Sequence, residues 1–188
     1  MDCLVVVAHP DDETLWMSGT ILRHKRWNWR IISLCRKYDN DRRPKFRRVC
    51  RLLGASCSIS DMEDEHPDRK MPAEEAEKRI MKMLRRRDYD VIYTHGPNGE
   101  YGHNRHKETH AAVMRLVENG KLRCKKLFVF NYKRKGKKWV AVRKSDRFVR
   151  LTRNEALTKK YLIDEVYCYT KDSPESRSCS RFESFNTV

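Results

Sequence analysis

No stretch of the sequence has the ~20 consecutive apolar residues that a helix needs to cross a bilayer. The N-terminus has no basic segment ahead of its short apolar run, so it lacks the signature of a secretory signal peptide. The seven cysteines form no C-x-x-C pair and are odd in number, which argues against a disulfide framework. We therefore expect a soluble, unsecreted protein in the cytoplasm, with reduced cysteines.

Motifs that define several other protein classes are missing too. The sequence has neither the G-x-S-x-G motif of many serine hydrolases nor the G-x-x-x-x-G-K motif of phosphate-binding loops. It has no internal repeat, no RNP-like aromatic pair and no zinc-finger spacing. A serine nucleophile, a P-loop and the common nucleic-acid-binding folds are therefore disfavoured.

The composition is that of a folded protein with a heavily charged surface. Hydrophobic residues make up 39% of the sequence and charged residues 36%. A chain of 188 residues is long enough for one buried core and short for two. We predict a single domain over residues 1–171 and a loosely ordered tail, rich in Ser, Arg and Glu, over residues 172–188.

The net charge is strongly positive, with 42 Lys and Arg against 26 Asp and Glu, a balance of +16. Such a field attracts nucleic acid, an acidic membrane surface, or a phosphorylated or carboxylated small substrate. The charge alone does not choose among these partners. A basic surface that only keeps the protein soluble explains it equally well.

Apolar β-rich runs alternate with amphipathic segments along the chain. We predict strands over 3–8, 29–35, 56–60 and 89–94, and helices over 13–25, 44–53, 73–87, 105–118 and 153–162. This alternation predicts an α/β fold with a mostly parallel sheet flanked by helices. Two further strands, over 126–132 and 139–142, would be joined by a turn at Gly136 and give the sheet an antiparallel edge hairpin.

Groups that bind metals follow two of the predicted strands. The pentad His9-Pro10-Asp11-Asp12-Glu13 comes directly after the first strand, and His95 comes directly after the strand over 89–94. A later G-H-x-x-H element places His103 and His106 on one face of a starting helix, with His110 one turn further. Ligands in open α/β sheets bind at the carboxyl ends of the strands, so these groups can converge. His9, Asp12 and one of the later histidines would then form a zinc site.

Simpler explanations exist for each of these groups taken alone. Asp11 and Asp12 could cap the following helix, and His95 could be a hydrogen-bonded structural residue. A capping role leaves His9 and the separate G-H-x-x-H element without a reason. We therefore favour metal chemistry.

At these two motifs the sequence resembles the PIG-L or LmbE-like family of zinc-dependent de-N-acetylases. The resemblance rests on residues 8–13, which read AHPDDE, and on residues 99–106, which read GEYGHNRH. It implies a Rossmann-like α/β fold and removal of acetyl groups from N-acetylglucosamine units or related amides. It also implies that His9, Asp12 and His106 bind Zn²⁺, that Asp11 is the general base and that His103 stabilises or protonates the tetrahedral intermediate.

The substrate contacts are less defined by the resemblance. Arg42 or Arg43 would be the basic contact, with His95 and Tyr101 as further candidates, although the residues from Lys45 onward are basic where the family usually has acid. The acidic segment 61–68 is interpreted as a loop that could also line the mouth of the site. Glu13 is interpreted as a supporting residue.

The sequence thus predicts a zinc hydrolase that deacetylates an amino sugar or glycoconjugate, favouring an anionic one. Hydrolysis of another small acylated amide would use the same chemistry. The alternative from a different class is a basic nucleic-acid-binding α/β module without catalysis, motivated by the charge, the basic clusters and the four tryptophans. Because it lacks recognition motifs, we do not expect nucleic acid as a partner. The sequence leaves the oligomeric state open.

Overall fold

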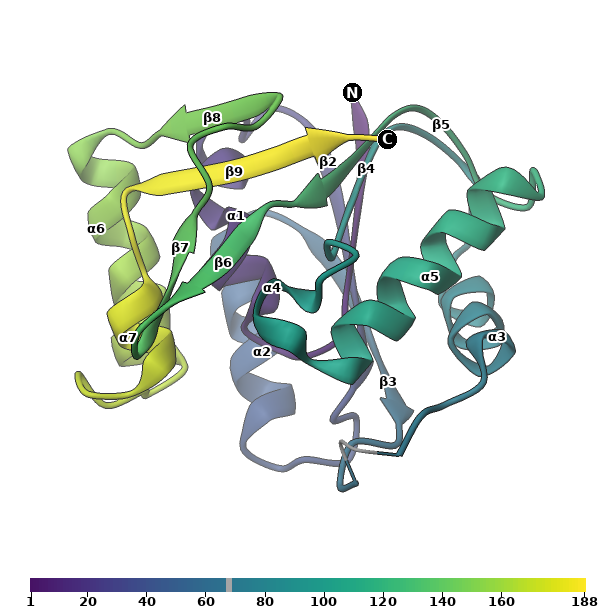
Figure 1. The fold of residues 1–188 in the computed structure, drawn as a ribbon, viewed down its shortest axis with the longest axis horizontal. Helices are drawn as coiled ribbons and strands as arrows, with labels where there is room; N and C mark the ends of the chain where they lie inside the picture. Colours follow the sequence, from purple (N-terminus) through teal and green to yellow (C-terminus); the bar gives the residue numbers. More distant parts are fainter. Residues whose placement is uncertain (67–68) are drawn as a thin grey trace.

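The computed structural model describes residues 1–66 and 69–188, and its centre is a seven-stranded sheet (Figure 1). The strand order is β3-β2-β1-β4-β5-β9-β8. The strands are β1 (Asp2–Val7), β2 (Asn28–Cys35), β3 (Ser56–Met62), β4 (Asp88–Thr94), β5 (Arg123–Phe130), β8 (Arg147–Arg150) and β9 (Phe182–Thr187). The first five strands in chain order are parallel to their neighbours, whereas β9 runs antiparallel to both β5 and β8. The predicted α/β fold with a mostly parallel sheet is confirmed.

Helices cover both faces of the sheet. The helices are α1 (Asp12–Arg23), α2 (Arg42–Leu52), α3 (Ala73–Met83), α4 (Gly99–Gly102), α5 (Asn104–Glu118), α6 (Arg153–Tyr161) and α7 (Pro174–Ser178), with a π-helical turn, η1 (Leu162–Val166), after α6. Val5 and Val7 of β1 pack with α1, α2 and η1, whereas Leu4 and Val6 pack with α3 and α5. Strand β1 is therefore buried on both sides, which explains its nearly continuous apolar sequence.

The antiparallel part of the fold differs from the prediction. The strand predicted over 126–132 corresponds to β5, which runs parallel to β4. The turn at Gly136 instead joins a separate strand, β6 (Tyr132–Lys135), to β7 (Lys138–Ala141), and this hairpin forms its own two-stranded sheet. The antiparallel edge of the main sheet consists of β9 and β8 instead. The helix predicted over 73–87 ends at Met83, because Tyr89 and the residues before it enter β4.

The expectation of a loosely ordered tail over 172–188 was wrong. This segment forms α7 and then β9, which lies between β5 and β8 in the main sheet. Glu183, Ser184 and Phe185 of β9 are buried. The polar composition of the segment suggested disorder. Its polar side chains are instead buried and hydrogen-bonded inside the protein, so the segment forms a strand.

Within the described ranges 1–66 and 69–188, no helix has the length and apolar character required for a membrane span.

Candidate metal centre

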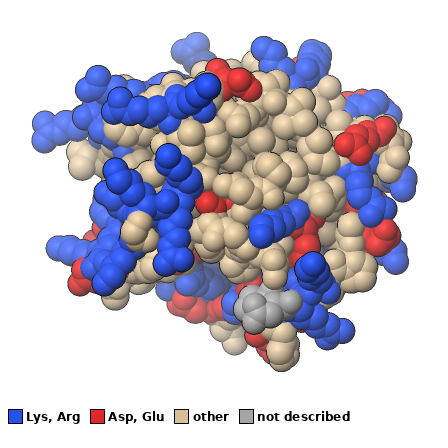
Figure 2. Space-filling model, viewed as in Figure 1, with Lys and Arg blue, Asp and Glu red and all other residues tan. Residues whose placement is uncertain are grey.

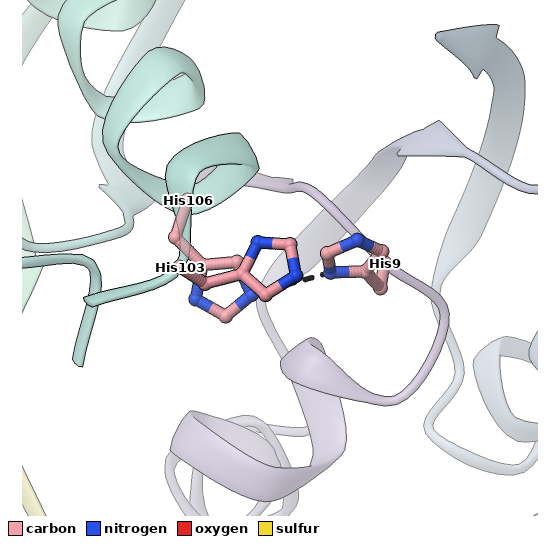
Figure 3. A group of neighbouring side chains, drawn as sticks. All are labelled: His9, His103 and His106. Atoms are coloured by element: carbon pink, nitrogen blue, oxygen red, sulfur yellow. Dashed lines mark hydrogen bonds between the residues drawn. The ribbon is translucent and has the colours of Figure 1, made fainter. Parts of the chain in front are cut away.

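The site lies where adjacent parallel strands β1 and β4 end. His9 follows β1, and His103 and His106 come from the beginning of α5, which approaches the same edge of the sheet. Figure 3 shows the imidazole of His9 pointing from its loop toward the two histidines of α5. The convergence predicted from the strand ends and the G-H-x-x-H spacing is present.

Three potential ligand atoms meet at nearly equal distances. His9 Nδ1 lies 3.2 Å from His106 Nε2, and Asp12 Oδ2 lies 3.5 Å from each of these nitrogens. Four atoms arranged tetrahedrally at about 2.0–2.1 Å from a zinc ion are roughly 3.3 Å apart. The spacing of these three atoms therefore matches one face of a zinc coordination tetrahedron and leaves the fourth position open.

Two carboxylates hydrogen-bond one ring nitrogen each of His106 and His9 and thereby orient the other ring nitrogen of each toward Asp12. Glu100 Oε2 lies 2.5 Å from His106 Nδ1, and Asp64 Oδ1 lies 3.0 Å from His9 Nε2. Burial opposes ionisation of both carboxyls, but their histidine partners, and Arg36 beside Asp64, hold the pKa of each at about 2. An ionised carboxylate only accepts hydrogen bonds, so His106 Nδ1 and His9 Nε2 carry the protons. In the neutral ring, which is the form that binds a metal, the opposite nitrogens face Asp12 and carry the lone pairs.

The electrostatics of the cluster favour a positive charge at its centre. Burial opposes the charge on Asp12, but His106 and His95 hold the pKa of its carboxyl well below its usual range. Asp12 is also fixed by hydrogen bonds from the His9 backbone N–H (2.8 Å) and the Trp16 indole (2.9 Å). Burial disfavours protonation of His9, yet Asp12 and Asp64 raise its pKa well above 6.5. A bound cation would satisfy the same carboxylates.

His95 does not have the position expected of a substrate contact. It is fully buried, its Nε2 accepts the Ala8 backbone N–H (2.9 Å), and its Nδ1 donates to Glu100 (2.7 Å). With both ring nitrogens occupied, His95 supports the strand end and Glu100, and its proposed contact with substrate is withdrawn. His95 Nε2 nevertheless lies 3.4 Å from Asp12 Oδ2, so His95 borders the cluster of ligand atoms, and His110 hydrogen-bonds its backbone carbonyl.

Asp11 is held in a strained conformation beside the cluster. Its φ of 111° is one that L-residues rarely adopt, and it costs on the order of 1–3 kcal/mol. Its carboxylate accepts hydrogen bonds from Arg42 (2.9 Å) and from the Tyr169 hydroxyl. Burial and the adjacent charge of Asp12 nevertheless raise the pKa of Asp11 to about 8, against the effect of Arg42. Asp11 makes no capping hydrogen bond with its side chain, so the simple capping explanation does not hold.

His103 lies at the N-terminal end of α5 with its ring next to His9 and His106. Its Nδ1 accepts the Arg105 backbone N–H (3.2 Å), which leaves Nε2 as the position for a proton. Burial and the two neighbouring histidines lower the pKa of His103 to about 4. The neutral ring is therefore a hydrogen-bond donor rather than a cation.

The cluster opens into a cleft of about 370 Å³ with aromatic walls. Tyr101, a predicted substrate contact, lines this cleft and stacks on Trp139 of the β6–β7 hairpin, with ring centroids 4.2 Å apart. Arg42 reaches the cleft, stacking on the Tyr169 ring at 4.5 Å. Arg43 does not line this cleft but a different one, so the structure removes it from the candidate substrate contacts.

Several residues of the site were missed. Asp64 belongs to the acidic segment interpreted as a loop, and an isolated acidic segment in a basic chain was its only signal; Asp68 of that segment lies outside the described residues. Glu100 stands within the second motif, whose pattern alone did not reveal its role. Trp139 and Tyr169 come from distant parts of the chain and had no signal in the sequence.

The fold and site define a class of α/β protein in which a mostly parallel sheet holds a histidine–carboxylate cluster at the carboxyl ends of its strands. Within that class, the family described as PIG-L, GlcNAc-PI de-N-acetylase, matches residues 4–117. The chain belongs to this family, and the resemblance inferred from the two motifs is confirmed.

Individual relatives and solved structures agree with this assignment. The chain is 28% identical over 120 residues to an uncharacterised protein of Acanthamoeba polyphaga mimivirus, an alignment covering 56% of this chain and 53% of that protein. It is 28% identical over 130 residues to the N-acetylglucosaminyl-phosphatidylinositol de-N-acetylase of Bos taurus, covering 63% and 51%. The alignments thus span about half the length of these relatives.

Two solved structures show the same fold over nearly the whole chain. The N,N'-diacetylchitobiose deacetylase of Pyrococcus horikoshii has a TM-score of 0.76 at 18% identity, covering 99% of this chain and 83% of that one. The 4-carboxy-2-hydroxymuconate hydratase of Pseudomonas putida has a TM-score of 0.69 at 17% identity, covering 100% and 96%. At these identities the likeness concerns the fold, which evidently supports more than one reaction.

Proposed function

We propose that the protein is a zinc-dependent hydrolase that removes the acetyl group from an N-acetylglucosamine-type amino sugar or glycoconjugate. The observation that carries this proposal is the convergence of His9 Nδ1, His106 Nε2 and Asp12 Oδ2 at 3.2–3.5 Å, with their lone pairs oriented by carboxylates. Membership of a de-N-acetylase family supports the reaction class. The cytoplasmic location stays a prediction.

The donor set of the cluster suits zinc. His9, Asp12 and His106 would hold the metal, which gives the three protein ligands and one open position of a catalytic site. Asp64 and Glu100 would orient the two histidine ligands, a role that commonly strengthens metal binding. When bound, zinc polarises the amide carbonyl and lowers the pKa of a water to about 7.

The remaining residues of the site fit the steps of amide hydrolysis. Asp11 accepts a proton from the attacking water, and its pKa, raised to about 8, lies close to neutral pH, where a general base is effective. His103, through its Nε2–H, donates a hydrogen bond to the oxyanion that develops on the carbonyl oxygen. Arg42 and Tyr169 hold the Asp11 carboxylate in place. The proton accepted by Asp11 then passes to the amide nitrogen, the C–N bond breaks, and acetate and a free amine are released.

The walls of the cleft favour a sugar with an acidic substituent. Tyr101 and Trp139 offer apolar ring surface against which a pyranose can pack. The hairpin that carries Trp139 also carries a run of exposed cations, Lys133, Arg134, Lys135, Lys137 and Lys138. Figure 2 shows Lys and Arg on all sides of this face, most densely at the left, where the hairpin lies. A phosphate or carboxylate on the substrate would be attracted to this rim.

The proposal is tested by metal analysis together with an acetate assay. We expect about one zinc per purified chain and acetate release from N-acetylated sugars, screened with free, phosphoinositol-linked and nucleotide-linked N-acetylglucosamine. Chelation should stop the release and added zinc should restore it. Release that survives complete removal of the metal, or a zinc-loaded protein inactive on every N-acetylated sugar tested, would contradict the proposal.

Replacing Asp11 with asparagine should lower kcat by roughly 10²–10⁴-fold, the usual contribution of general-base catalysis, while the zinc content stays unchanged. The amide keeps the size of the side chain but cannot accept a proton from water at neutral pH. Zinc analysis and acetate release are measured on the same preparation. A variant with near-normal kcat would remove Asp11 from the role of base.

A further inference from the structure

A second and larger cleft, of about 1160 Å³, lies at the open edge of the sheet. Its floor is β3, the edge strand, and its walls are α2 and α3, which pack on opposite faces of the sheet and both contact β3. None of the residues that line this cleft also lines the candidate metal centre. It is therefore a separate site.

Unpaired cations line both walls of the edge cleft. Within the part of the chain that the structure describes, seven of its lining cations have no ion pair with a carboxylate: Arg30, Lys37, Arg43, Arg47, Lys78, Lys82 and Arg85. Arg43 and Arg47 are four residues apart on α2, and Lys78 and Lys82 are four apart on α3. Like charges at this spacing on a helix destabilise it by a few tenths of a kcal/mol. An anion between the walls would offset this repulsion.

A thiol on the floor of the cleft lies close to the lining arginines. Cys57 of β3 is half-buried there, beside Cys50 of α2. A hydrogen bond from Cys50, together with the charges of Arg30 and Arg47, lowers the pKa of the Cys57 thiol to about 7 in spite of its burial. The cleft therefore stabilises a negative charge at its base.

We propose that the edge cleft binds the sugar–phosphate backbone of a single-stranded nucleic acid. Cations on two facing walls contact a chain lying between them, whereas a flat membrane surface would reach only the rim. The seven residues of β3 extend over ~23 Å, which is long enough for several nucleotides and too long for one small anion. A second copy of the chain would bring the same positive charges to this edge, and the resulting repulsion disfavours it as the occupant of the cleft.

Two further features favour a nucleic acid over an acidic peptide. Six of the lining cations are arginines (Arg30, Arg43, Arg47, Arg79, Arg85 and Arg86), and the guanidinium fork matches a phosphate through paired hydrogen bonds. Tyr38 lines the cleft with 68% of its surface exposed and offers a ring face on which a base can stack. The sequence spreads these residues over the 57 positions from Arg30 to Arg86, so neither its net charge nor its lack of recognition motifs, on which the expectation of no nucleic-acid partner was based, revealed that they share one cleft.

The test is a titration of the full-length protein into a fluorescent oligothymidylate of about twelve nucleotides, followed by anisotropy between about 50 and 200 mM salt. For single strands the slope of log K against log salt is about −0.7 per phosphate neutralised. The variant Lys78→Glu/Lys82→Glu should therefore bind roughly tenfold or more weakly, with a slope at least about one unit shallower. Arg47→Glu on the opposite wall should act in the same direction, which guards against a folding defect in α3.

The matched control is Lys121→Glu/Lys144→Glu, which changes the net charge equally at two exposed lysines that line neither cleft. We expect it to bind within about twofold of the unaltered protein, because separated surface charges are screened at these salt concentrations. Equal losses in both double variants, or no binding at the lowest salt, would overturn the proposal. So would tighter binding to an oligoglutamate peptide or to phosphatidylserine vesicles than to the oligothymidylate.

Discussion

The variant His106→Ala is expected to lose both bound zinc and acetate release. His106 supplies one of only three protein ligand atoms at the proposed centre, and its Nε2 lies 3.2 Å from His9 Nδ1 and 3.5 Å from Asp12 Oδ2. Residues that only orient a metal ligand typically contribute ~10–100-fold to affinity or activity, so a ligand should contribute more. We expect kcat/KM to fall on the order of 10³-fold or more, with the zinc content of the dialysed protein falling in parallel.

The control for this variant is His66→Ala. The His66 side chain is 73% exposed, and among the described residues its ring bonds only Glu63, so its loss should change neither zinc content nor activity. Circular dichroism and a thermal melt establish that each variant is folded before the zinc is measured. His106→Ala that retains both zinc and activity would move the centre away from His9 and Asp12. Activity lost with zinc fully retained would make His106 a catalytic group instead of a ligand.

The parts of the site that could be predicted are those fixed by the backbone. A strand ends where its apolar run ends, and parallel neighbours bring their carboxyl ends to one edge of the sheet. That reasoning placed His9 and Asp12 beside a later helix, and the three-residue spacing put His103 and His106 on the side of α5 that faces them. The spacing of residues along a helix and the direction of a strand are local properties of the chain, so the sequence alone predicts this part of the site.

The parts that could not be predicted depend on long-range packing. His95 looked accessible because it follows a strand, but its ring is occupied by Ala8 and by Glu100, and only the fold brings Ala8 to it. Asp64 reaches His9 from 55 positions away, and Tyr169 reaches Asp11 from 158 positions away. A strand with buried polar residues, such as β9, lacks the alternation of apolar and polar residues from which a strand is predicted.

Glu183 of β9 shows why that strand is ordered, and its replacement should produce the largest loss of stability. Its fully buried carboxylate accepts hydrogen bonds from the backbone N–H groups of Gly19 and Thr20 (both 2.8 Å) and from the Thr20 hydroxyl (2.7 Å). It also pairs with the buried Lys159 ammonium at 2.8 Å. One side chain thereby connects the last strand to the middle of α1 and to α6.

In the variant Glu183→Ala the Lys159 ammonium stays buried without its partner, and two backbone donors of α1 lose their acceptor. Breaking a buried ion pair in this way usually costs about 3–5 kcal/mol, a large part of the ~5–15 kcal/mol that stabilises a typical domain. Urea unfolding followed by circular dichroism should show a lower midpoint with a similar slope. Because α1 begins at Asp12, the variant should also bind zinc less tightly before it unfolds.

Two further variants separate the charge from the packing. Glu183→Ala/Lys159→Met removes both charges and should recover part of the loss, since an uncompensated charge is costlier than an absent pair. Asp88→Ala breaks the exposed pair with Arg123 and should leave the midpoint almost unchanged. If Glu183→Ala unfolds at the same urea concentration as the unaltered protein, the contacts of Glu183 do not stabilise the fold, and β9 is held by its strand pairing and apolar contacts. If the double variant is no more stable than the single one, the hydrogen bonds to α1, rather than the unpaired ammonium, account for the loss.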